Sequence, residues 1–262
     1  MTDYQKFLEG KRHLLGSFGF KANYIPDCAF DFQKFAIESA VSKGRQAVFL
    51  DTGLGKTLVQ LSIARNIIEH TNKKVLILTP LAVGFQFIKE AEVRGITDDI
   101  EISKDGKHTK KIVICNYERL HYFNEKDFEC VILDESSILK NFDGKIKNNI
   151  TAFIKKIPYR FLSTATPSPN DFIELGTSSE ALGYMGYMDM LGKFFKANNN
   201  AVDSSNRNIG EKFYLKPHAE KDFFAWVNQW SIMAKMPSDL GNFSDERYKL
   251  PELIINKSIM SN

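Results

Sequence analysis

Cysteine is scarce in this 262-residue sequence, and Cys28, Cys115 and Cys130 lie far apart without a CxxC pair. The sequence therefore suggests neither a disulfide framework nor a zinc site. Long apolar runs are also missing. No run approaches the roughly 18 residues that a membrane-spanning helix needs, and the first residues lack the apolar core of a signal peptide. We therefore expect a protein that works in a cytoplasm without a membrane partner.

Charge of one sign does not dominate the sequence. The 35 Lys and Arg residues nearly balance the 32 Asp and Glu residues, which gives a formal net charge of +3. This mildly basic balance permits a polyanionic partner without requiring one. Hydrophobic residues make up 43% of the chain, enough to bury a sizeable core in one large domain or two small ones.

Residues 47–57, AVFLDTGLGKT, have the pattern of a buried strand, a turn with two glycines and the start of a helix. Gly53 and Gly55 let backbone N–H groups converge on an anion at the N-terminus of that helix. Lys56 is then expected to reach the β- and γ-phosphates of a nucleotide, and the Thr57 hydroxyl to ligate the accompanying Mg²⁺.

One position departs from the strict phosphate-loop pattern GxxxxGK[ST], because Leu50 stands where that pattern has glycine. A glycine-lysine-threonine triplet also occurs at ordinary strand-to-helix turns. The next residues favour the nucleotide site, since apolar side chains from Leu58 to Ile68 recur at helical spacing and give one apolar face. The predicted nucleotide-binding residues of this loop are Thr52, Gly53, Gly55, Lys56 and Thr57.

A second segment with chemical potential is VILDESS, residues 131–137, an apolar strand with Asp134 and Glu135 at its carboxyl end. Open α/β sheets bind ligands at this end of their strands. Such a pair alone is often a helix cap. Together with a phosphate loop, it predicts that Asp134 holds Mg²⁺ and that Glu135 orients or deprotonates the attacking water.

A third segment, FLSTATPSPND at 161–171, reads as a strand that ends in hydroxyl residues and then two prolines. Thr164 and Thr166 are placed to hydrogen-bond the acidic pair and to report the state of the γ-phosphate. Without the other two segments, this one would be a strand followed by a proline-stiffened turn.

Apolar strands alternate with helices over the first two thirds of the chain, which predicts a parallel sheet covered on both faces. Beside the segments above, we expect helices at 30–44, 81–93 and 145–156 and strands at 74–79, 111–116, 128–136 and 159–165. A short helix is expected within residues 1–29.

The pattern changes after Pro169. Residues 171–195 are expected to be helical, and the polar residues 196–210 are a loop by composition. A further helix is expected at 218–236, followed by a short strand-like run after Pro251. In that helix, aromatic and apolar side chains at helical spacing predict core packing: Phe223, Trp226, Val227 and Trp230.

The order of these segments resembles that of superfamily 2 helicases and translocases, specifically the Swi/Snf-type group. The motifs of that group follow one another in a fixed order. The corresponding segments occur here in the same order: FDFQ, DTGLGKT, ILTPLAV, ICNYERL, LDESSILKN and STATPSPND. The resemblance implies a RecA-like α/β fold, with a parallel sheet, helices on both faces and a mostly helical C-terminal extension. It also implies ATP and Mg²⁺ as cofactors, with Lys56, Asp134 and Glu135 as catalytic residues.

Several single residues acquire roles through this resemblance. Gln33 matches the glutamine that recognises adenine, and Ser137 stands where a histidine couples ATP to DNA; Thr164 and Thr166 join Ser137 in this coupling. The resemblance implies a nucleic-acid partner, double-stranded DNA, contacted by loops after two strands. The candidate contacts are Thr79, Pro80, Asn116, Tyr117 and Lys140, and Lys145 and Lys147 extend Lys140 into a lysine cluster.

The tail from Leu215, ending in LPEL, resembles helicases of tailed bacteriophages and prophages, which would place the protein in a bacterial host cytoplasm. The implied division is an N-terminal segment (1–29), a RecA-like ATP-binding lobe (30–175), a helical extension (176–245) and the start of a linker (246–262). A second RecA-like lobe, which carries the arginines that complete the ATP site, is expected to lie outside this chain.

Other functions stay open at this point. An RNA helicase or a restriction-type translocase would use the same motifs. A nucleotide-gated nucleic-acid-binding module would bind ATP without turnover. A P-loop kinase or small-molecule ligase fits less well, because no arginine-rich lid segment follows the acidic pair and the TPSPN segment has no use there.

Overall fold

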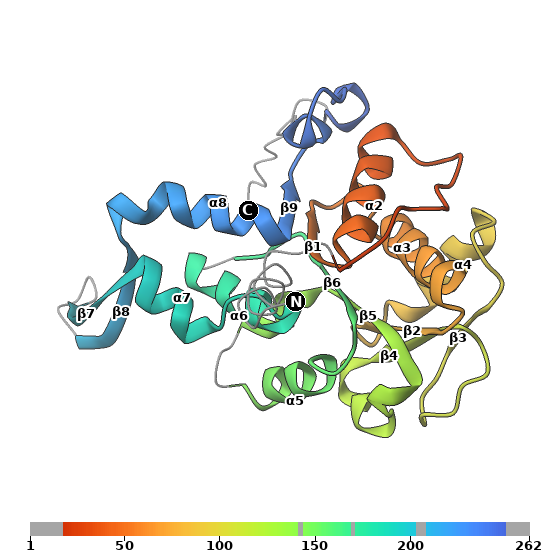
Figure 1. The fold of residues 1–262 in the computed structure, drawn as a ribbon, viewed down its shortest axis with the longest axis horizontal. Helices are drawn as coiled ribbons and strands as arrows, with labels where there is room; N and C mark the ends of the chain where they lie inside the picture. Colours follow the sequence, from red (N-terminus) through yellow and green to blue (C-terminus); the bar gives the residue numbers. More distant parts are fainter. Residues whose placement is uncertain (1–17, 141–143, 169–170, 203–207, 250–262) are drawn as a thin grey trace, which may run out of the picture.

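The computed structural model describes residues 18–140, 144–168, 171–202 and 208–249 of the chain (Figure 1). Its centre is a seven-stranded sheet in which every pairing is parallel. The strand order is β3-β4-β2-β5-β6-β1-β9. The strands are β1 (Arg45–Leu50), β2 (Lys74–Thr79), β3 (Ile100–Ile102), β4 (Ile112–Asn116), β5 (Phe128–Asp134), β6 (Tyr159–Ser163) and β9 (Ser231–Ala234).

Helices cover both faces of this sheet, as Figure 1 shows. One face packs against α2 (Asp31–Lys43), α3 (Lys56–Thr71) and α4 (Gly84–Val93). The other packs against α5 (Lys145–Ile154), α6 (Leu175–Leu182), α7 (Tyr187–Phe194) and α8 (Glu220–Trp230). Alternation along β1 sorts its side chains, since Val48 and Leu50 join the first core and Ala47 and Phe49 join the second. The predicted RecA-like α/β architecture is confirmed.

Short 3₁₀ helices occupy several connections. They are η1 (Tyr117–Tyr122), η2 (Glu125–Asp127), η3 (Ser136–Lys140), η4 (Phe172–Glu174), η5 (Pro217–Ala219), η6 (Pro237–Leu240) and η7 (Glu246–Tyr248). Helix α2 ends where the sequence predicts, because Gly44 adopts φ 69° and its N–H donates to the carbonyl oxygen of Ala40 at 2.9 Å.

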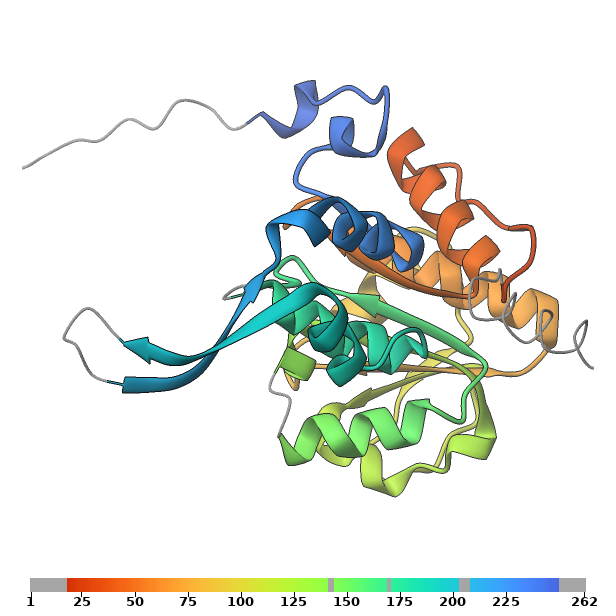
Figure 2. The ribbon, with the colours of Figure 1, turned by 60° about the vertical axis from the view of Figure 1, so that its left-hand side comes forward.

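The prediction of a loop over 196–210 is wrong. An antiparallel hairpin of β7 (Phe195–Val202) and β8 (Asn208–Leu215) occupies this region and extends away from the sheet (Figure 2). Phe195 is buried and Phe213 and Leu215 pack against the core, and these three residues lie at the base of the hairpin. The polar residues of β7 and β8 are held by backbone pairing, which amino-acid composition does not reveal. Composition therefore gave no indication of a strand in this region.

The predicted helix over 218–236 is right only as far as Trp230. Its aromatic stripe is confirmed as core: Phe223, Trp226, Val227 and Trp230 are buried. Residues Ser231–Ala234 then form β9, which pairs with β1 as an edge strand of the sheet. This strand extends the parallel sheet beyond β1.

Two expectations lie outside the described ranges, namely the short opening helix and the strand-like run after Pro251. Among the described residues, no helix combines the length and apolarity needed to cross a lipid bilayer.

Candidate nucleotide site

The three segments singled out in the sequence meet at one edge of the sheet. Because all strands are parallel, the loops after β1, β5 and β6 leave from the same edge. The three strands are also neighbours in the order β5-β6-β1. The phosphate loop, the acidic pair and the hydroxyl-rich turn are therefore brought together, although the first lies far from the other two in the sequence.

The loop after β1 places a cation over backbone oxygens. Gly53 and Gly55 have φ values of 88° and 78°, which a side chain would disfavour, and α3 begins at Lys56. The Lys56 Nζ donates to the carbonyl oxygens of Leu50 at 3.0 Å and Asp51 at 3.3 Å. The Lys56 side chain thus reaches from the start of α3 back to the end of β1. Its ammonium group can exchange these carbonyl partners for phosphate oxygens.

Gln33 ties the N-terminus of α2 to this loop. Its side chain is buried, with Oε1 accepting from the Phe30 N–H at 2.9 Å and Nε2 donating to the Leu54 carbonyl oxygen at 3.0 Å. A Cβ atom at Gly55 would approach Gln33 Nε2 to 2.3 Å. Gly55 is therefore required both for its backbone conformation and for this close approach.

Asp134 ends β5 and is bound by a residue that sequence reasoning missed. Gln60, one turn beyond Thr57 on α3, donates from Nε2 to Asp134 Oδ1 at 2.8 Å and to Ser163 Oγ at 3.1 Å. The signal was present, because Gln60 is a polar residue in an apolar helix and lies four residues after Lys56. Burial raises the pKa of the Asp134 carboxyl, and the Gln60 hydrogen bond opposes that rise.

Glu135 is held by two hydroxyl groups. Its Oε1 accepts from Ser137 Oγ at 2.8 Å and from Thr164 Oγ1 at 2.7 Å. Glu135 has φ 53°, a left-handed conformation that is uncommon for glutamate and that turns the chain sharply after β5. The predicted contact of Thr164 is confirmed. Thr166 instead donates its backbone N–H to Thr164 Oγ1 at 3.0 Å, and so supports the pair indirectly.

The candidate nucleic-acid contacts divide by exposure. Thr79 and Tyr117 are buried, and the Tyr117 hydroxyl donates to the Asp134 carbonyl oxygen at 2.5 Å. Pro80 and Asn116 are half-buried at the same edge of the sheet, and Lys140 is exposed. The side chains of Thr79 and Tyr117 are therefore part of the interior, whereas Pro80, Asn116 and Lys140 are accessible to a ligand.

The predicted lysine cluster is not formed as expected. Lys147 is 4% exposed and pairs with Glu180, with Nζ and Oε2 3.0 Å apart. Lys147 stabilises the packing of α5 on α6, and its burial prevents contact with a polyanion. The side chain of Lys145 lies outside the described part of the structure.

The residues at this edge fit Mg²⁺ and a nucleoside triphosphate. Thr57 and Asp134 offer hard oxygen donors of the kind Mg²⁺ prefers, and they come from elements that the Gln60–Asp134 hydrogen bond joins. A Cβ atom at Gly53 would meet nothing within 4 Å, so the loop is open on the side where phosphates would approach. Lys56 supplies the compensating positive charge.

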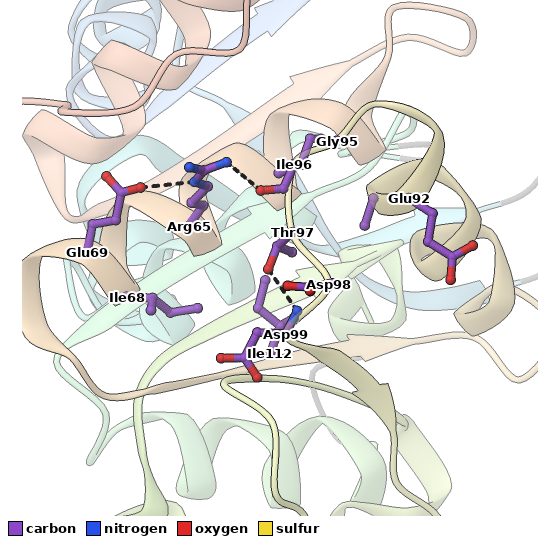
Figure 3. A pocket seen from close by; sticks show the side chains of 11 residues that line it. Arg65, Ile68, Glu69, Glu92, Gly95, Ile96, Thr97, Asp98, Asp99 and Ile112 are labelled. Carbon is purple, nitrogen blue, oxygen red and sulfur yellow. Dashed lines mark hydrogen bonds and ion pairs between the residues drawn. The ribbon is translucent and has the colours of Figure 1, made fainter.

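A second cavity, of about 490 Å³, lies near the opposite edge of the sheet (Figure 3). Among the described residues that line it, the cation is Arg65, which is paired with Glu69 at 2.9 Å and also donates to the Ile96 carbonyl oxygen. The other charged residues of its lining are acidic: Glu92, Asp98 and Asp99. This lining repels phosphates, so the cavity does not suit the phosphates of a nucleotide.

Residues 30–174, which include all three segments, match the DEAD/DEAH box helicase family. The chain belongs to this family. It is 24% identical over 259 residues to the CHD3-type chromatin-remodeling factor PICKLE of Arabidopsis thaliana, covering 79% of this chain and 18% of that protein. It is 28% identical over 140 residues to the uncharacterized ATP-dependent helicase YqhH of Bacillus subtilis, covering 50% of this chain and 25% of that protein. The chain thus spans a quarter or less of these relatives.

The fold of this DEAD/DEAH box helicase domain is similar to two solved helicase structures. The Sulfolobus solfataricus SWI2/SNF2 ATPase core in complex with dsDNA gives a TM-score of 0.63 at 17% identity, over 82% of this chain and 46% of that one. The UvsW helicase from bacteriophage T4 gives 0.51 at 16% identity, over 70% and 65%. The predicted resemblance to Swi/Snf-type helicases is confirmed, and UvsW gives weaker support to the phage likeness.

Proposed function

We propose that this chain is the ATP-binding lobe of a DNA-dependent ATPase, which couples Mg-ATP hydrolysis to movement along double-stranded DNA when a second lobe faces it. One observation carries the proposal: Lys56, Asp134 and Glu135 lie where β1 and β5 end at the same side of the sheet, and Gln60 and Thr164 hold the two carboxylates there. The proposed division is a RecA-like lobe (30–175), an extension (176–245) and the start of a linker (246–262). Strand β9 of the extension completes the sheet.

Each residue has a separate task in this proposal. Lys56 exchanges the carbonyls of Leu50 and Asp51 for phosphate oxygens, and Gly53 and Gly55 direct backbone N–H groups to the same anion. Thr57 and Asp134 hold Mg²⁺, which when bound neutralises charge on the β- and γ-phosphates. Glu135 orients water, because the hydroxyls of Ser137 and Thr164 fix the plane of its carboxylate.

The same contacts support the proposed coupling. Thr164 begins the turn after β6, so a change at Glu135 is passed to that turn and to Thr166. Ser137 forms a second link, from Glu135 to η3, which ends at the exposed Lys140. Nucleic acid would contact Pro80, Asn116 and Lys140, and Thr79 and Tyr117 through their backbone only. Double-stranded DNA is supported by the Sulfolobus core, which was captured on dsDNA.

The second lobe is proposed as a partner because catalysis would be shared across a cleft. Arginines from the facing lobe would stabilise transition-state charge and contribute about 10³ to 10⁵ in rate in related phosphoryl-transfer systems. Residues 1–262 alone should therefore bind ATP and hydrolyse it slowly. The likeness to UvsW supports a phage-type helicase acting in a host cytoplasm.

Steady-state ATP hydrolysis with no nucleic acid, with duplex DNA and with duplex RNA tests this function. We expect a low rate for residues 1–262 and a DNA-stimulated rate for a longer chain that includes the second lobe. Stimulation by RNA alone would favour an RNA helicase. Binding of ATP without turnover in the longer chain would favour a nucleotide-gated module. Robust DNA-stimulated turnover by residues 1–262 would contradict the need for a facing lobe.

A further inference from the structure

The β7–β8 hairpin projects away from the sheet and its helices as a two-stranded ribbon, as Figure 2 shows. Its base is held by one face, because the register pairs Phe195 with Leu215 and Ala197 with Phe213. Phe195 is buried, and Phe213 and Leu215 pack against the same core. A hairpin beyond such a packed base is marginally stable in water. Its projection is therefore better explained by a partner than by the folding of this lobe.

The opposite face of the ribbon carries polar residues. Lys196 pairs with Tyr214 on this face, where the lysine is exposed and the tyrosine is 47% exposed. The next pair of the same register joins Asn198 and Lys212. Because successive residues of a strand alternate between faces, positions 196, 198, 212 and 214 share one face. The outward face of the ribbon thus begins with a lysine beside an aromatic ring.

Positive charge is concentrated in this part of the chain. Residues 193–216 contain five Lys and Arg residues and two acidic residues, a net charge of +3, which equals the formal net charge of the whole chain. Lys193 precedes the hairpin and is exposed. Lys216 follows it and donates from Nζ to the carbonyl oxygens of Gly192 and Lys193 at 2.9 and 3.1 Å. A polyanion is the partner with the complementary charge.

Packed elements connect the base of the hairpin to the edge proposed for nucleic acid. The Phe195 ring lies edge-on to Phe223 at a centroid distance of 5.5 Å, and the Phe172 ring lies 6.0 Å from Phe223. Phe172 begins η4, the short helix that follows the hydroxyl-rich turn after β6. Helix α6 packs on η3, which ends at Lys140, and on α7, which leads into the hairpin. A duplex at Lys140 would therefore have the hairpin on the same side of the lobe.

Duplex DNA fits the hairpin better than a protein partner does. The centres of protein interfaces are depleted in lysine, whereas the described outward pair is Lys196 and Tyr214. Residues 196–212 also include five asparagines. Ammonium, amide and hydroxyl groups are the donors that bind phosphate oxygens and base edges. A two-stranded ribbon fits the major groove of B-DNA, while the major groove of A-form RNA is too narrow for it.

We propose that the β7–β8 hairpin is a second contact of this lobe with double-stranded DNA, and that Lys196 binds a backbone phosphate beside the Tyr214 ring. The inference rests on the proposed function and deepens it, because the hairpin lies outside the segment that matches the helicase family. Pro80, Asn116 and Lys140 would hold the duplex at the sheet edge. The hairpin holds a separate stretch of the same duplex and fixes its direction across the lobe.

Fluorescence anisotropy of the 262-residue chain with a labelled DNA duplex, measured over a range of salt concentrations, tests this contact. Lys196→Ala removes one phosphate contact, so the slope of log affinity against log salt should become shallower by about 0.9. Over the range from 1 M to 0.1 M salt, that change amounts to roughly an eightfold loss of affinity. Lys126→Ala is the matched control, because this exposed lysine lies in η2, before the start of β5, and it should change neither quantity.

A shortened hairpin tests the ribbon as a whole. Replacing residues 198–212 by Asn-Gly, a two-residue turn between Ala197 and Phe213, keeps the packed base and removes the projecting part. Duplex affinity should fall further than in Lys196→Ala, and affinity for a non-hydrolysable ATP analogue should stay unchanged. A melting curve shows whether the shortened chain folds. If it does not fold, Lys196→Ala decides, since its side chain is exposed.

The outcomes separate the hairpin contact from the proposed function. Unchanged duplex affinity and salt slope in the two hairpin variants would overturn the contact and leave the nucleotide site and the sheet-edge loops standing. Weaker binding at an unchanged slope would also overturn it, because no phosphate contact would have been lost. An equal loss in Lys126→Ala would overturn it as a general effect of net charge. If the unsubstituted chain bound the ATP analogue but no duplex, the DNA-binding part of the proposed function would fail together with the hairpin contact.

Discussion

Gln60 donates a hydrogen bond of 2.8 Å from Nε2 to Asp134 Oδ1, and so joins the helix of the phosphate loop to the acidic end of β5. The same nitrogen donates to Ser163 Oγ on β6. Gln60 is 2% exposed, so these contacts are shielded from water. The carboxylate that we propose as a Mg²⁺ ligand is thereby oriented from α3, one turn beyond Lys56 and Thr57.

Gln60→Leu should keep the fold and slow ATP hydrolysis. Leucine fills the buried space but removes the donor to Asp134, a bond of the charged type that contributes roughly 1.5 to 3 kcal/mol, so we expect a loss of about ten- to a hundredfold in kcat/KM. Single-turnover hydrolysis measures the loss. Ser62→Ala, which removes a buried hydroxyl that donates to the Leu58 carbonyl oxygen of its own helix, is the control and should have no effect. Equal rates for Gln60→Leu and the unsubstituted chain would show that Asp134 needs no orienting partner.

Glu135→Gln should still bind ATP but lose hydrolysis by about 10² to 10⁴, the usual contribution of a general base. Glutamine keeps an oxygen that can accept from Ser137 and Thr164, so the turn after β5 should be preserved. Nucleotide titration beside a rate measurement separates the two effects. Hydrolysis at the unsubstituted rate would reduce Glu135 to a structural residue.

Asp134→Asn should raise the melting temperature at neutral pH. Burial raises the pKa of Asp134, so the folded state binds its proton more tightly than the unfolded state does. This carboxyl thus favours folding fully below its unfolded pKa, and the benefit is lost as pH rises through the folded pKa. Asparagine stays neutral and can still accept from Gln60. The gain in melting temperature should shrink as the pH is lowered through the carboxyl range, and a gain that grows on acidification would contradict the assignment.

Tyr117→Phe should destabilise the fold by about 1 kcal/mol and leave duplex DNA affinity unchanged. The reason is that the Tyr117 hydroxyl donates to the Asp134 carbonyl oxygen and the ring is buried. Thermal melting and a DNA titration at fixed salt measure the two quantities. Tyr122→Phe, at an exposed ring of the same short helix, serves as the control. A selective loss of DNA affinity in Tyr117→Phe would restore Tyr117 as a direct contact.

Features that depend on local chemistry were predictable from the sequence. Gly44 ends α2 because glycine accepts a left-handed backbone, and apolar strands alternating with helices required a parallel sheet. Parallel strands in turn placed the phosphate loop and the acidic pair at one edge. The partner of Asp134 could not be predicted, because Gln60 contacts it only through the packing of α3 on β5.

The features that were missed depend on contacts distant in sequence. Strand β9 exists because an edge position beside β1 was free to pair with Ser231–Ala234, and nothing local ends α8 at Trp230. Lys147 resembled a solvated lysine until Glu180, 33 residues later, provided a buried partner. The hairpin at 195–215 is polar and pairs through its backbone, which composition does not record.

The central claim, that the loop after β1 binds the phosphates of ATP, is tested most directly by Lys56→Ala. Calorimetric titration with a non-hydrolysable ATP analogue in Mg²⁺ is compared with a melting curve, and Lys89→Ala, at an exposed lysine on α4, is the control. We predict that Lys56→Ala loses measurable binding while its melting temperature and the binding of Lys89→Ala stay unchanged. Unchanged affinity in a folded Lys56→Ala variant would contradict the nucleotide site.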